Sequence, residues 1–178
     1  ELRAWENLEH WEGGCLDGGW WNEALHGVAR NGKATVFPQA IGMAATFNED
    51  LIYQVADAIS DEARAKYNAA IQRGIHAQYA GLTFWSPNIN IFRDPRWGRI
   101  AESLGEDPYL ACRLTVAMIE GFQGDDLAAI GSIAATAKHF AGYGAVESGR
   151  DYATTNVSEY ELRNYYLRPF KAAVDAGV

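Results

Sequence analysis

The 178-residue sequence has only two cysteines, Cys15 and Cys112, which stand far apart and form no Cys-x-x-Cys pair. It therefore offers neither a disulfide framework nor a zinc signature, and the cysteines do not indicate whether the protein resides in an oxidising or a reducing compartment. No apolar run approaches the ~18 residues that a membrane span requires. The N-terminus shows no cationic start followed by an apolar segment, so no signal peptide is predicted. We expect no membrane association, and the cellular location stays unknown.

Positive charge is also scarce, with 15 Lys and Arg against 23 Asp and Glu and a net charge of −8. Binding to nucleic acid depends on neutralising phosphates, so an acidic chain without a basic stripe is not expected to bind it. Aromatic residues, in contrast, make up 12% of the chain. Such residues either fill a core or form a site that stacks against flat apolar faces.

Two long helices are predicted from capping residues and apolar periodicity. The first covers residues 48–74, because Asn48 can cap its N-terminus and apolar residues recur with a helical period until Gly74. The second covers residues 107–121, where an Asp-Pro pair opens the helix and a glycine closes it.

A third helix is predicted over residues 158–177. Ser158 and Glu161 have the spacing of a capping box, and Leu162, Tyr166, Phe170, Ala173 and Val174 form one apolar side. Pro169 should kink this helix. Val178 follows its closing glycine at a point where another strand is expected, so we expect the sequence to stop at the start of an element.

Two strands are predicted between these helices. Residues 82–92 are rich in β-formers and interrupted by Pro87, and residues 132–137 form a buried strand that Lys138 and His139 close. Apolar strands that alternate with helices are typical of a parallel sheet covered by helices. The predicted fold class is therefore α/β.

The ends of parallel strands are where α/β proteins build their sites, and polar residues gather at three such places. Lys138 and His139 end one strand, and a short basic cluster follows the other, while Glu23 and His26 lie beside two tryptophans in an early loop. The sequence contains no G-x-S-x-G, no phosphate-binding loop and no H-E-x-x-H. Carboxylates and guanidinium groups bind vicinal hydroxyls and an indole covers a ring face, so the set suits a sugar.

Each of these residues also has a purely structural interpretation. Glu23 could be a solvated loop carboxylate, the Asp94–Arg96 pair a plain ion pair, and His26 and His76 structural histidines, while Arg99 alone is undecided. A cation at the end of a buried strand, such as Lys138, needs either a partner or a solvated opening.

Five segments, WWNEALHGVAR, ATVFPQAIGMAATF, SPNINIFRDPRWGRIAESLGEDPYL, AATAKHFAGYG and SEYELRNYYLRPFKAAVDAG, occur together in this order. In this the chain resembles the N-terminal domain of glycoside hydrolase family 3, most of all its β-xylosidase branch. The resemblance covers residues 20–178 and leaves residues 1–19 as an irregular lead-in. The run KHFAGYG lacks the proline and second histidine of the N-acetylglucosaminidase branch, which disfavours that branch.

The resemblance implies the first half of a (β/α)8 TIM-like barrel and a retaining, exo-acting glycosidase without metal or organic cofactor. It implies β-linked xylosides or glucosides as substrates, with the rest of the barrel and a C-terminal domain as partners. The implied substrate-binding residues are Glu23, Arg99, Lys138, His139 and Arg150. The nucleophile and the acid/base are expected beyond residue 178, so no residue here is assigned a catalytic role and the isolated chain is expected to be inactive.

The alternative is a non-catalytic carbohydrate-binding or scaffold module, which a second copy of the chain could complete as an oligomer. A half-barrel exposes a strand edge and an apolar helix face, so we expect the isolated chain to be unstable or to self-associate. An assay of the isolated chain on an aryl β-xyloside is the test. Turnover that Lys138→Ala abolishes would show that the chain assembles a carboxylate pair after all, whereas binding without turnover favours the non-catalytic module for this chain.

Overall fold

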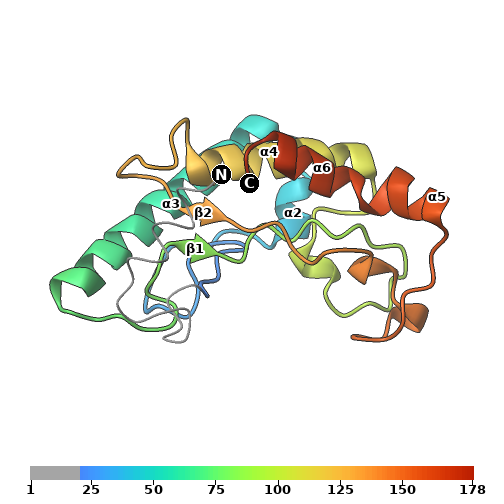
Figure 1. Cartoon of the computed structure of the whole chain (residues 1–178), viewed down its shortest axis with the longest axis horizontal. Coiled ribbons are helices and arrows are strands. Elements are labelled where there is room, and N and C mark those ends of the chain that lie inside the picture. Colours follow the sequence, from blue (N-terminus) through green and yellow to red (C-terminus); the bar gives the residue numbers. More distant parts are fainter. Residues whose placement is uncertain (1–20) are drawn as a thin grey trace.

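The computed structural model describes residues 21–178, so the predicted lead-in and Cys15 lie outside the described residues. The helices of this part are α2 (Ala40–Ala44), α3 (Glu49–Gln72), α4 (Pro108–Gln123), α5 (Glu159–Glu161) and α6 (Arg168–Asp175), as Figure 1 shows. Shorter helical turns are η2 (Ile100–Glu102), η3 (Tyr143–Ala145), η4 (Glu147–Gly149) and the π-helical η5 (Leu162–Tyr166). The strands are β1 (Thr83–Phe84) and β2 (Ala134–Ala135).

The two strands pair in parallel, with Thr83 opposite Ala134. Isolated parallel bridges extend this pairing, from Asn22 to Phe84 on one side and from Asn88 to Lys138 beyond β2. Three chain segments therefore run side by side in the order of the sequence. Both regular strands are much shorter than predicted, because the residues around Pro87 pair only through isolated bonds.

The helices α3, α4 and α6 lie along one side of the strands, and α4 packs between the other two (Figure 1). The inward face of α4 supplies much of the core, with Leu114, Met118 and Phe122 almost completely buried. No helix in residues 21–178 is long and apolar enough to cross a membrane. The described chain is thus a mixed α/β unit with parallel strands, and the predicted half-barrel stays a prediction.

The two long helices begin where the sequence predicts. Asn48 Oδ1 accepts a hydrogen bond from the Leu51 amide at 3.0 Å, and Asp107 Oδ1 accepts one from the Leu110 amide at 2.7 Å. The end predicted for the second helix is wrong, because α4 continues through Gly121 to Gln123. Gly121 lies at the contact between α4 and α3, where a Cβ atom would stand 2.6 Å from Ala56 Cβ and 2.6 Å from the Tyr53 carbonyl oxygen.

Replacing Gly121 with alanine should lower the free energy of unfolding by about 1–3 kcal/mol, because the new methyl group forces α3 and α4 apart. Chemical denaturation followed by circular dichroism would measure this loss. Gly42→Ala is the matched control, since Gly42 is also helical but its nearest neighbour, Pro38 Cβ, lies at an ordinary 3.7 Å. Equal stability of the two variants would contradict this packing role.

The third predicted helix begins with the expected capping box, in which Ser158 Oγ accepts from the Glu161 amide at 3.2 Å and the Ser158 amide donates to Glu161 Oε2 at 3.0 Å. The helix is interrupted just before Pro169, where the Leu167 amide donates to the Leu162 carbonyl at 2.8 Å in a π-helical turn. Of the apolar side predicted for this helix, Tyr166, Phe170 and Ala173 are buried, whereas Val174 is 66% exposed.

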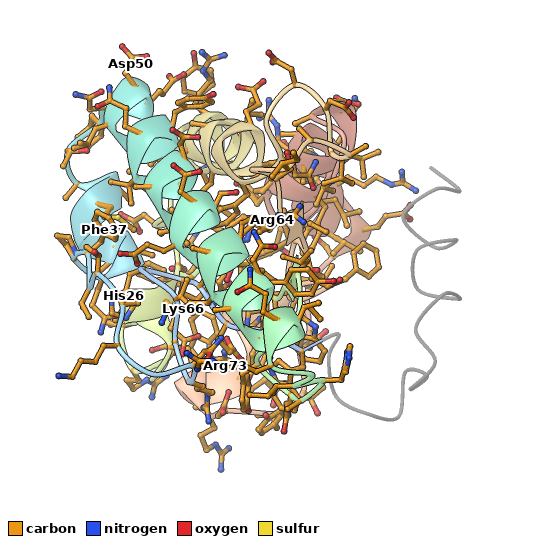
Figure 2. All side chains as sticks on the ribbon, turned by 90° about the vertical axis from the view of Figure 1, so that its left-hand side faces the viewer. His26, Phe37, Asp50, Arg64, Lys66 and Arg73 are labelled. Atoms are coloured by element: carbon orange, nitrogen blue, oxygen red, sulfur yellow. The ribbon has the colours of Figure 1, made fainter. Side chains whose placement is uncertain are left out.

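The segment that carries Glu23 is fastened to α3 by side chains on that helix. Lys66 Nζ donates to the carbonyl oxygens of Asn31 and Lys33, at 2.8 and 2.5 Å. In the same segment His26 Nδ1 is 2.9 Å from the Phe37 carbonyl oxygen, and Figure 2 labels both residues together with Lys66 of α3. This contact supports the structural interpretation of His26.

Candidate functional site

Lys138 and Glu23 meet across the ends of the parallel segments, because the segments that carry them flank the one around β1 on opposite sides. The Lys138 amide donates to the Pro87 carbonyl at 3.1 Å, and its own carbonyl accepts from the Ile89 amide at 2.8 Å, so its backbone is held on both sides. Its Nζ lies 3.5 Å from Glu23 Oε2. Lys138 is only 8% exposed. The buried cation therefore has a partner, which is what a charge at this position requires.

Glu23 is held by aromatic residues as well as by the lysine. Trp21 Nε1 donates to Glu23 Oε1 at 2.8 Å. The Trp21 ring stacks on Trp85 with centroids 4.8 Å apart and an interplanar angle of 13°. The Glu23 side chain is 18% exposed, so it is not a freely solvated loop carboxylate.

His139 points its ring toward Asn90 on one side and Tyr143 on the other. Its Nδ1 lies 2.9 Å from Asn90 Oδ1. The ring packs edge-on against Tyr143 at a centroid distance of 5.0 Å. The Arg99 guanidinium covers the same tyrosine ring at 5.5 Å. Tyr143 thus stands between the histidine and the arginine.

Arg99 is oriented by a carboxylate from its own turn. Its Nε donates to Glu102 Oε2 at 2.8 Å, and a second nitrogen lies 2.6 Å from the same oxygen. Glu102 therefore serves to hold the Arg99 side chain in place.

The electrostatics of the cluster follow from burial beside several charges. Burial lowers the pKa of Lys138, an effect that Glu23 opposes and Arg99 reinforces. Burial, together with the positive charges of Arg99 and Lys138, lowers the pKa of His139 to about 4 from its ordinary 6.5. His139 is consequently a neutral ring at pH 7, and the cluster combines two cations with a neutral acceptor and a carboxylate.

The loop after His139 folds back over this cluster. The Lys138–His139 and Phe140–Ala141 peptide bonds are both cis. Gly144 approaches the preceding segment so closely that a Cβ atom would stand 2.0 Å from the Ile91 carbonyl oxygen. The close approach places η3, which contains Tyr143, against the strand ends.

The glycosyl hydrolase family 3 N-terminal domain profile matches residues 20–178. The chain belongs to this family. It is 43% identical over 162 residues to a xylan 1,4-beta-xylosidase of Xylanibacter ruminicola, covering 87% of this chain and 18% of that protein. It is 40% identical to beta-D-xylosidase 1 of Arabidopsis thaliana, covering 89% of this chain and 21% of that protein.

Solved structures of the family also resemble the chain in fold. A beta-glucosidase from Listeria innocua in complex with glucose superposes with a TM-score of 0.75 at 37% identity, covering 89% of this chain and 20% of that one. The same enzyme has also been solved with laminaribiose, as a D270A mutant. The chain thus spans about a fifth of the length of its family 3 relatives.

The structure brings four of the five predicted substrate-binding residues together: Glu23, Arg99, Lys138 and His139. The side chain of Arg150, the fifth residue, is exposed and forms no ion pair with the residues that the structure describes. Its neighbour Asp151 instead contacts the cluster, accepting a hydrogen bond from the Tyr143 hydroxyl. The Asp94–Arg96 pair is an exposed ion pair at 2.7 Å, as its structural interpretation holds.

Sequence reasoning missed Trp85, Asn90 and Tyr143. Trp85 and Asn90 lie in the segment that reads as a strand, and Tyr143 lies in a glycine-rich loop, so none of them follows a pattern that marks a site. The neighbouring tryptophans at 20 and 21 were the nearest signal, since they suggested a stacking surface beside Glu23.

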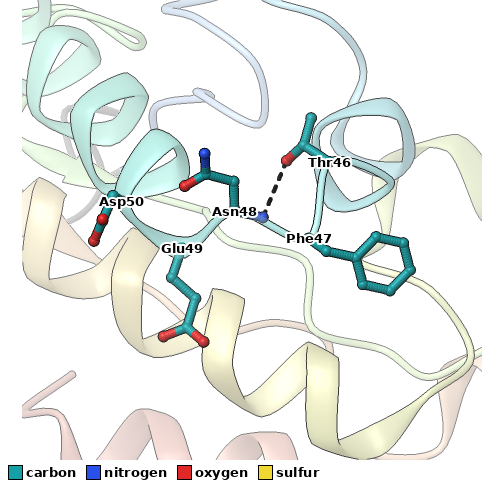
Figure 3. Close-up of a pocket in the computed structure, with 5 residues that line it drawn as sticks. All are labelled: Thr46, Phe47, Asn48, Glu49 and Asp50. Atoms are coloured by element: carbon teal, nitrogen blue, oxygen red, sulfur yellow. Dashed lines mark hydrogen bonds between the residues drawn. The ribbon is translucent and has the colours of Figure 1, made fainter.

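A shallow hollow elsewhere on the surface, lined by Thr46 to Asp50 at the start of α3, is a poor alternative site (Figure 3). Several of its polar groups are already used: the Thr46 hydroxyl accepts from the Asn48 amide at 3.3 Å, and Glu49 binds Arg113. In residues 21–178 no three His, Cys, Asp or Glu side chains group as ligands for a metal ion.

Proposed function

We propose that Glu23, Arg99, Lys138 and His139 bind the terminal sugar of a β-xyloside or β-glucoside in a retaining, exo-acting glycosidase. The observation that carries this proposal is the buried Lys138–Glu23 ion pair, 3.5 Å apart, with His139 next to it. A hydroxyl both donates and accepts hydrogen bonds, so a vicinal diol fits a lining in which donors and acceptors alternate. The family and the named relatives support a glycoside as the ligand.

An apolar surface for the sugar ring lies beside these polar groups. Trp21 is hydrogen-bonded to Glu23 and stacked on Trp85, so both indoles are held in fixed orientations. Aromatic faces pack against the C–H groups of a sugar ring while the hydroxyls reach the polar residues. This combination favours a pyranose over an open-chain polyol.

The chemistry itself is proposed to come from parts of the enzyme outside residues 21–178. A retaining glycosidase uses two carboxyl groups about 5–5.5 Å apart, one as nucleophile and one as acid/base. Glu23 and Glu102 are each already paired with a cation, Lys138 and Arg99 respectively. They are therefore suited to holding hydroxyls and cations in place. The parallel segments would be the first part of a (β/α)8 barrel whose remainder supplies the two catalytic groups.

The test is to measure binding and turnover on the same 178-residue chain. Titration with methyl β-xyloside should move the amide NMR signals of residues next to Glu23, Lys138 and His139. Xylitol, which has hydroxyls but no ring, should move them far less. 4-Nitrophenyl β-xyloside should not be hydrolysed.

Two results would overturn the proposal. Absence of any response to methyl β-xyloside and methyl β-glucoside would remove the sugar site. Turnover that Lys138→Ala abolishes would show that the chain assembles a catalytic carboxylate pair of its own, against the assignment of chemistry to other regions.

A further inference from the structure

Asn90 makes three contacts with His139, more than any other side chain in the cluster makes with one residue. The His139 amide donates to Asn90 Oδ1 at 2.8 Å, and Asn90 Nδ2 donates to the His139 carbonyl at 2.7 Å. His139 Nδ1 lies 2.9 Å from the same Oδ1. Asn90 is only 3% exposed, so bulk water does not compete for these bonds.

These contacts fix which ring nitrogen of His139 carries the proton. A backbone amide can only donate and a backbone carbonyl can only accept, so the Asn90 side-chain amide has one possible orientation. Its Oδ1 can only accept, and therefore His139 Nδ1 must donate to it. A neutral ring has a single N–H, so Nε2 is left as an unprotonated acceptor.

Asn90 is itself held in place by the strand pairing. Its amide donates to Asn88 Oδ1 at 3.1 Å. Asn88 in turn forms the parallel bridge with Lys138. The backbone that places the lysine therefore also places the amide that orients the histidine.

We propose that Asn90 is a positioning residue that holds His139 as its Nδ1–H tautomer, so that Nε2 accepts a hydrogen bond from a substrate hydroxyl. This inference rests on the proposed sugar-binding function. It assigns a role to Asn90, which is not among the predicted substrate-binding residues. It also specifies that a substrate hydroxyl donates the hydrogen bond and that the His139 ring accepts it.

The other groups that face His139 explain why an acceptor is useful there. Arg99 and Lys138 can only donate, while Glu102 is paired with Arg99 and Asp151 accepts from the Tyr143 hydroxyl. Nε2 has no hydrogen-bond partner within residues 21–178. It is thus an available acceptor beside two donors, and a sugar hydroxyl that accepts from a cation can donate to the ring.

The low pKa of His139, about 4, agrees with this arrangement. Its causes are burial first, then the positive charges of Arg99 and Lys138, with Glu102 and Asp151 acting in the opposite direction. A ring that stays neutral at pH 5–8 keeps Nε2 unprotonated, which the acceptor role requires.

The experiment is nitrogen-15 NMR of the imidazole in the full chain and in two variants, Asn90→Ala and Asn90→Asp. The wild type should show a protonated Nδ1 and an unprotonated Nε2 at pH 7. Asn90→Ala should lose this single tautomer and bind methyl β-xyloside about 2- to 10-fold more weakly, the range of one hydrogen bond. Asn90→Asp should keep the Nδ1–H tautomer, because a carboxylate still accepts, and raise the titration midpoint of the ring above about 4.

Asn164→Ala is the control, because Asn164 lies on an exposed helical turn and donates only to the Tyr160 carbonyl. It should change neither the tautomer nor the midpoint. A protonated Nε2 in the wild type overturns the inference, as does an Asn90→Ala variant with an unchanged ring spectrum. If Asn90→Ala does not fold, the inference is tested by the ring tautomer of the wild type and by the tautomer and titration midpoint of Asn90→Asp.

The proposed function can fail separately from this inference. An Nδ1–H ring in a chain that binds no glycoside would overturn the sugar site while confirming that Asn90 sets the tautomer. Sugar binding that is intact in Asn90→Ala, with the tautomer lost, would instead overturn the role of Nε2 as an acceptor.

Discussion

Lys138→Met should weaken the binding of methyl β-xyloside by about 10- to 100-fold, the effect of losing a hydrogen bond from a charged donor. Methionine preserves the apolar stem of the side chain but removes the ammonium group. Glu23, whose side chain is 18% exposed, then loses its cationic partner. The loss should appear as a higher dissociation constant in an NMR titration, with amide signals outside the cluster unchanged.

Lys171→Met is the matched control, because Lys171 is exposed on α6 and pairs only with Asp175. Its affinity for the glycoside should equal that of the wild type. In a double variant, Lys138→Met with Glu23→Gln, the loss of binding free energy should be smaller than the sum of the losses in the two single variants, because both substitutions remove the same ion pair. Full affinity in Lys138→Met, or strictly additive losses, would show that the pair does not act as a unit.

Phe122→Ala should lower the free energy of unfolding by about 3–5 kcal/mol, the usual cost of truncating a large aromatic side chain in a core. Phe122 is 0% exposed and lies near the end of α4, whose inward face supplies much of the core. Its carbonyl also accepts the Ile133 amide at 2.9 Å, immediately before β2. The cavity would therefore loosen the helix at the place where it supports the strand leading to Lys138.

Phe47→Ala provides the comparison, because Phe47 is 73% exposed and its loss leaves no cavity. Urea denaturation of both variants, followed by tryptophan fluorescence, would give the two free energies. A typical domain has only about 5–15 kcal/mol of stability, so Phe122→Ala should remove a large part of it. Equal midpoints for the two variants would contradict the central place of α4 in the core.

The long helices could be predicted from sequence because their signals are local. Asn48, Asp107 and the Ser158–Glu161 box each cap a helix through residues three positions apart, so the pattern and the contact coincide. The predicted helix end at Gly121 is wrong because glycine is a common helix stop signal, whereas here the absence of a side chain allows α3 to pack closely against α4. That neighbour is distant in sequence, and no local pattern announces it.

The candidate site was predictable only in part, for a related reason. Lys138 and His139 end a strand, which marks them, and Glu23 stands beside a tryptophan pair. Asn90 has no such mark, because its significance depends on a backbone 49 residues away. Arg150 has the residue type that binds sugars, yet its side chain is exposed, whereas the next residue, Asp151, accepts a hydrogen bond from Tyr143.

The Lys138–Glu23 pair joins two segments that lie far apart in the sequence. Bringing two such distant segments together costs loop-closure entropy. A local helix such as α3 forms without this cost, because its contacts join residues close in sequence. A ligand bound between these two side chains would stabilise the folded state, because a ligand that binds only the folded state shifts the folding equilibrium towards it by mass action. Sugar binding at the cluster and folding of the chain are then thermodynamically linked. A higher sugar concentration would therefore shift the folding equilibrium towards the folded protein.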